Sequence, residues 1–76
     1  MSQRLPAIRP REVIRALERA GWVVHRQRGS HAIMRKEGMR HVVSVPLHTR
    51  DMPRGTLQGI VEDAGLSVEE FLQLLS

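Results

Sequence analysis

The chain has 76 residues and a net charge of +4, and it contains no cysteine. This length allows one small domain, and the lack of cysteine excludes disulfides and zinc–thiolate sites. No apolar run approaches the ~18 residues of a membrane-spanning helix, and no signal-peptide pattern begins the chain. We therefore expect a single soluble, cytoplasmic domain over residues 1–76.

The charge is unevenly distributed. Residues 1–50 contain eleven basic and three acidic residues, whereas residues 51–76 contain one arginine and five acidic residues. All basic residues except Lys36 are arginine, which binds phosphate groups through paired donors and stacks on bases. The basic part of the chain predicts an anion-binding surface, although for any single arginine a merely solvated position is the alternative.

The first expected element is a helix that follows a loosely held arm over residues 1–8. Pro10 suits the first helical position, and Glu12 lies in the first turn, where the helix dipole favours a carboxylate. Gly21 is a typical C-terminal stop. Apolar residues at helical spacing predict the buried side of this helix: Val13, Ile14, Ala16, Leu17 and Ala20.

Three strands and two helices are expected after this helix. Residues 22–27, 31–36 and 41–45 have strand composition, with turns at glycine between them. Pro53 can begin a second helix, and a capping box from Ser67 to Glu70 begins a third. The order α-β-β-β-α-α predicts an α+β fold with a three-stranded antiparallel sheet packed against helices.

The segment Gly29-Ser30-His31 is the best candidate for chemistry. Gly29 permits a sharp turn, Ser30 offers a hydroxyl and an amide, and His31 supplies an imidazole, which exchanges protons near neutral pH. In a basic surrounding this predicts RNA cleavage, in which a base activates the ribose 2′-hydroxyl and an acid protonates the leaving 5′-oxygen. On these residues alone, a structural or surface histidine is the commoner case.

Hairpin geometry separates the other histidines from His31. A two-residue turn pairs His31 with Ser44 or Pro46 and brings His48 to the same end of the sheet, so His48 is a supporting candidate. His41 then lies ~10–17 Å from His31. The face occupied by the fourth histidine, at position 25, depends on the strand register and stays open. Because the four spacings match no ligand motif, we expect no metal or other cofactor.

RNA contacts are expected mainly through phosphate and shape. Trp22 and Phe71, the two large aromatic residues, are expected in the core, so base stacking on the sheet is not expected. The basic residues that we expect to bind RNA are Arg11, Arg15, Arg26, Arg28, Arg35 and Lys36.

The chain resembles the HicA family, which comprises small toxins of bacterial and archaeal toxin–antitoxin pairs. The resemblance spans roughly residues 8–75 and is carried by Ala20-Gly21-Trp22, Arg26-Gln27-Arg28-Gly29-Ser30-His31, Val45-Pro46-Leu47-His48, and Gly55-Thr56-Leu57 followed by Ile60 and Ala64-Gly65-Leu66-Ser67. It implies a fold similar to double-stranded-RNA-binding domains, a ribosome-independent mRNA endonuclease with His31 catalytic, and a HicB antitoxin as partner.

Two other functions fit the same composition. The first is a non-catalytic RNA-binding module that blocks translation by occupancy, and the second, weaker one is a domain whose basic face binds only an acidic protein. Fold and charge do not distinguish these two functions from that of an RNase. RNA shortening that depends on His31 would identify the RNase.

Overall fold

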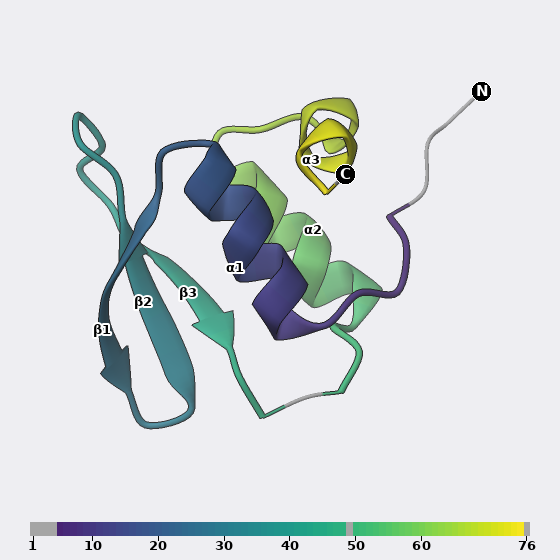
Figure 1. Cartoon of the computed structure of the whole chain (residues 1–76), viewed down its shortest axis with the longest axis horizontal. Coiled ribbons are helices and arrows are strands. Elements are labelled where there is room, and N and C mark those ends of the chain that lie inside the picture. The colour runs from purple at the N-terminus through teal and green to yellow at the C-terminus, as the bar shows by residue number, and fades with distance from the viewer. Residues whose placement is uncertain (1–4, 49, 76) are drawn as a thin grey trace.

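The computed structural model describes residues 5–48 and 50–75. Its elements are α1 (Pro10–Arg19), β1 (Val23–Arg28), β2 (His31–Arg35), β3 (Val43–Pro46), α2 (Arg54–Asp63) and α3 (Val68–Leu74). The strands form one antiparallel sheet in the order β1-β2-β3, with the helices to one side of it (Figure 1). This confirms the α+β fold and the predicted order, which is consistent with a double-stranded-RNA-binding-like domain.

The ends of the helices follow local signals in the sequence. The Arg9 N–H donates to the Glu12 carboxylate at 3.1 Å at the start of α1, and Gly21 adopts φ +99° just beyond its end. At α3 the predicted capping box is confirmed: Ser67 Oγ accepts from the Glu70 N–H at 3.0 Å, and Glu70 Oε1 accepts from the Ser67 N–H at 2.8 Å. Within the described residues, no helix is long and apolar enough to cross a membrane.

The strand register matches one of the two predicted alternatives. His31 pairs with Pro46 of β3, and it pairs with Arg28 of β1 on its other side. Between β1 and β2 the register shifts at His25, which is the extra residue of a β-bulge and has no partner on β2. This bulge explains why the face of His25 could not be assigned from alternation.

All three strands differ from the prediction by one or two residues at their ends. β1 runs from Val23 to Arg28 rather than from 22 to 27, and Trp22, just before it, is fully buried in the core. β2 ends at Arg35, one residue earlier than predicted. β3 runs from Val43 to Pro46 rather than from position 41 to 45. The side chain of His41 binds the end of α2, as described below, and Pro46 is tolerated because it ends an edge strand.

One core joins the sheet to the helices. The inner sheet face contributes Ala32, Met34, Val43 and Val45, all buried, and the largest fully buried side chains are Trp22 and Phe71, as expected. The N-terminal segment also packs here, since Leu5 and Ile8 are buried and the Ile8 carbonyl accepts from the Met52 N–H at 2.7 Å. Residues 5–8 therefore differ from the loose arm that we expected, while residues 1–4 lie outside the described residues.

Candidate functional site

His31 lies at the start of β2, in a hairpin turn that local sequence dictates. Gly29 has φ +59°, and Gly29-Ser30 forms the two-residue connection between Arg28 and His31. Glycine at the first central position is typical of a type II′ turn, which matches the twist of the flanking strands. The Gln27 amide donates to the Gly29 carbonyl at 3.1 Å, and the Ser30 carbonyl accepts from the Leu47 N–H at 2.7 Å. The turn is thus held both locally and by the segment after β3.

The ring of His48 lies beside the ring of His31. Their centroids are 6.3 Å apart and the ring planes meet at 65°. His48 follows Leu47, whose hydrogen bond to Ser30 brings the end of β3 to the turn. This confirms that His48 emerges at the same end of the sheet as His31.

The sheet surface opposite the helices, here called the outer face, carries three of the expected arginines. Residues paired across antiparallel strands point to the same face, and successive residues alternate. His31 therefore shares the outer face with Arg28, which is its partner on β1. The paired rows place the following residues on this face: Val23, Arg26, Arg28, His31, Ile33, Arg35, Ser44 and Pro46.

The two expected arginines of α1 lie elsewhere. Arg11 and Arg15 line an open groove of about 800 Å³ between α1 and the segment after β3. Leu47, which is bonded to Ser30, also lines this groove, so it adjoins the His31 end of the sheet. The remaining lining residues are Arg9, Pro10, Glu12, Ile14, Glu18 and Arg50.

The groove adds two arginines that sequence reasoning missed. Arg9 directly precedes α1, and its proximity to Arg11 was an available signal. Arg50 belongs to the irregular segment between β3 and α2, and no pattern in the sequence predicts the path of that segment. With Arg11 and Arg15 they give the groove four arginines against two glutamates.

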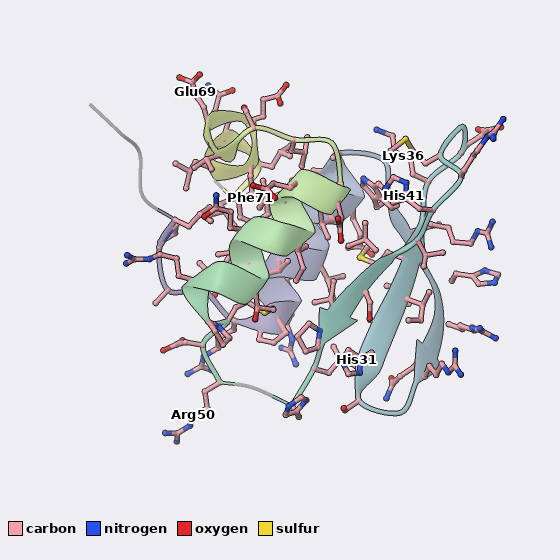
Figure 2. All side chains as sticks on the ribbon, turned by 180° about the vertical axis from the view of Figure 1, so that it is seen from behind. His31, Lys36, His41, Arg50, Glu69 and Phe71 are labelled. Atoms are coloured by element: carbon pink, nitrogen blue, oxygen red, sulfur yellow. The ribbon has the colours of Figure 1, made fainter. Side chains whose placement is uncertain are left out.

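Lys36 and His41 lie at the other end of the sheet from His31 (Figure 2). Lys36 is five residues from His31, or roughly 17 Å along an extended strand. Its side chain packs against Gly21, where an added Cβ would lie 3.2 Å from Lys36 Cε. The structure therefore does not bring Lys36 together with the histidine pair.

His41 makes structural contacts with the end of α2 and with Trp22. Its Nε2 donates to the carbonyl oxygen of Asp63, the last residue of α2, at 2.6 Å. Its ring lies 6.0 Å from the ring of buried Trp22. These contacts tie the β2–β3 connection to the C-terminal end of α2, where unpaired carbonyls need donors.

By contrast, neither His31 nor His48 has a hydrogen-bond partner within residues 5–48 and 50–75. His31 is half-buried and His48 is exposed, so both rings remain open to a ligand. In the same part of the chain, no three acidic or histidine side chains are placed to hold a metal ion. The arrangement can exchange protons with a bound anion that the neighbouring arginines neutralise.

The comparisons identify the family of the chain. A sequence profile described as "HicA toxin of bacterial toxin-antitoxin" matches residues 10–66. A comparison with curated proteins finds no match. The matched region runs from the start of α1 to the turn after α2 and contains both His31 and His48. The chain belongs to the HicA toxin family of bacterial toxin–antitoxin systems.

Proposed function

We propose that this toxin is a metal-independent endoribonuclease that cleaves mRNA, with His31 as an acid–base group. The observation that carries the proposal is the position of His31, next to a tight turn and directly opposite Arg28. Its ring makes no hydrogen bond within the described residues, so the protein does not already use it as a structural donor. Membership of the HicA family supports the same activity.

The chemistry needs few groups. A base removes the proton of a ribose 2′-hydroxyl, and the resulting oxygen attacks the adjacent phosphorus. The bond from phosphorus to the 5′-oxygen breaks, and an acid protonates that leaving oxygen. The transition state gains negative charge on the phosphate oxygens, which nearby cations and N–H groups stabilise. Arg28 and the exposed Gly29-Ser30 turn lie beside His31 and are suited to this role. Arg26 and Arg35 extend the cationic surface along the outer face.

A non-catalytic RNA-binding module is the alternative, since occupancy of mRNA would use the same basic surface. Purified protein incubated with end-labelled RNA distinguishes the two. We expect discrete shortening by the wild type and none by His31→Ala. His25→Ala is the matched control, because His25 is an exposed histidine on the same sheet that pairs with no residue of β2. RNA that is bound and retarded but never shortened would favour occupancy.

A HicA toxin implies a cognate antitoxin. An antitoxin that covers the outer face blocks RNA binding directly. Because this face is basic, it favours a partner with exposed carboxylates. Glu69, in the acidic part of the chain, lies far from His31 across the molecule (Figure 2). We infer that the antitoxin binds around His31 and leaves the acidic C-terminal part, including Glu62, Asp63 and Glu70, largely outside the contact.

A further inference from the structure

We propose that His48 is a second catalytic residue, and that His31 and His48 divide the two proton transfers of RNA cleavage between them. This inference rests on the proposed function, which by itself requires only one histidine. It deepens that function by assigning a role to a residue of the segment after β3.

The first support is the geometry of the pair. The ring centroids are 6.3 Å apart with a 65° angle between the planes. No hydrogen bond joins the rings to each other or to any other side or main chain of the described residues. The rings are thus close enough to contact one phosphodiester group from two directions, and neither is occupied by a protein partner. His41, whose Nε2 is bonded to a main-chain carbonyl, shows what a structural histidine looks like in this fold.

The second support is the way in which His48 is held. The preceding residue, Leu47, donates its N–H to the Ser30 carbonyl, and Pro46 pairs with His31. Leu47 is half-buried and also packs against the core. The chain before His48 is therefore held directly against the chain at His31, although the two histidines are 17 positions apart in the sequence.

The third support is charge. Arg28 lies opposite His31 on the outer face, and Arg50 follows His48 two residues later on the wall of the groove. Of these two arginines, Arg28 is the one that the sheet register places beside the pair, and its positive charge favours a phosphodiester bound at the rings.

The reaction itself favours two groups over one. In phosphoryl transfer the attacking and leaving oxygens lie roughly in line through the phosphorus. One imidazole accepts the 2′-hydroxyl proton while O2′ forms a bond to phosphorus. The second, protonated imidazole gives its proton to O5′ as the P–O5′ bond breaks. The products are a 2′,3′-cyclic phosphate and a 5′-hydroxyl, and the pair as a whole keeps its proton count.

The test compares three histidine variants on two substrates. On ordinary RNA we expect His31→Ala and His48→Ala each to lose about 10²–10⁴-fold in cleavage rate, the usual contribution of a positioned acid or base. His25→Ala, the matched exposed histidine, should stay within about twofold of wild type. The second substrate has sulfur in place of the bridging 5′-oxygen at the cleaved position, so its leaving group needs no proton. Only the variant that lacks the acid should then recover to near the wild-type rate.

Several outcomes would overturn the pair. If His48→Ala cleaves ordinary RNA at nearly the wild-type rate while His31→Ala does not, the proposed RNase activity stands and the catalytic role of His48 is refuted. Equal behaviour of both variants on the sulfur substrate would also refute the division of roles. Absence of RNA cleavage by the wild type would refute the proposed function itself. Circular dichroism and thermal melting of each variant, together with His48→Gln, which keeps a polar side chain without an acid–base group, separate loss of chemistry from loss of fold.

Discussion

Arg28 lies directly opposite His31 in the β1–β2 ladder, separated from it along the chain by Gly29 and Ser30 alone. Both side chains therefore point to the outer face of the sheet. Because the pair is formed within one tight hairpin, its geometry depends little on distant packing. A phosphate that approaches His31 therefore also meets this guanidinium.

Charge reversal at Arg28 should weaken RNA binding more than reversal at any other arginine. Measured in a His31→Ala background, Arg28→Glu should lower the affinity and flatten the log–log dependence of affinity on salt by at least ~1, the slope of one lost phosphate contact. Arg40→Glu makes the same charge change in the exposed β2–β3 connection. Equal losses in both variants would mean that only the bulk charge matters, and a salt-independent affinity would mean that the basic surface is merely solvated.

His31→Ala should remove activity without removing the fold. His31 is half-buried at the first position of a strand and makes no hydrogen bond within the described residues, so its side chain contributes little to the core. We expect a change in the free energy of unfolding within about 0.5 kcal/mol, typical of such surface positions. Chemical denaturation measures this directly, and growth inhibition on expression reports the activity. Toxicity equal to that of the wild type would contradict the assignment.

His41→Ala should lower the stability of the fold without removing the activity. Truncation removes the donor to the exposed Asp63 carbonyl and the ring contact with Trp22, so we expect a loss of about 0.5–1.5 kcal/mol of stability, the usual net contribution of one hydrogen bond. Cleavage measured well below the melting temperature should be retained, because His41 lies at the far end of the sheet from His31 (Figure 2). The melting temperature of the His41→Ala protein is compared with that of the His25→Ala protein. An unchanged melting temperature would show that the contact with α2 contributes nothing.

Cleavage should persist in EDTA. The prediction rests on the placement of side chains, since no three potential ligands converge within the described residues, and on acid–base groups that need no Lewis acid. The assay is the same end-labelled RNA digestion, with and without chelator. Activity that is lost in EDTA and restored by a divalent ion would refute it.

The antitoxin should protect the outer face and stabilise the toxin. A partner that binds only the folded form adds about 4 kcal/mol of apparent stability when its free concentration is ~1,000 times its dissociation constant. Amide exchange on the complex should show protection around β1, β2 and His31, with association that slows as salt rises. Protection confined to residues 54–76, with His31 still open to chemical modification, would mean that neutralisation acts from a distance.

Much of the fold was predictable because it depends on neighbours in the chain. Backbone preference, capping and apolar spacing act over a few residues. They account for the start of α1 at Pro10, the Ser67 cap before α3, the turns at Gly29 and Gly38, and the burial of Trp22. The short turn between β2 and β3 likewise limited their register to two alternatives. Both alternatives predicted that His48 lies near His31.

Tertiary packing settled what depends on contacts between distant segments. The bulge at His25 sets the register between β1 and β2, and the side chain of His41, just before β3, binds the end of α2. The expected arginines divide between the outer face and the α1 groove, because a helix and a strand packed in one core present their solvent sides in different directions. Arg50 joined the groove through an irregular segment without sequence periodicity. The cause is physical: register, bulges and loop paths are chosen by the burial of the whole core, and no short stretch of sequence contains that information.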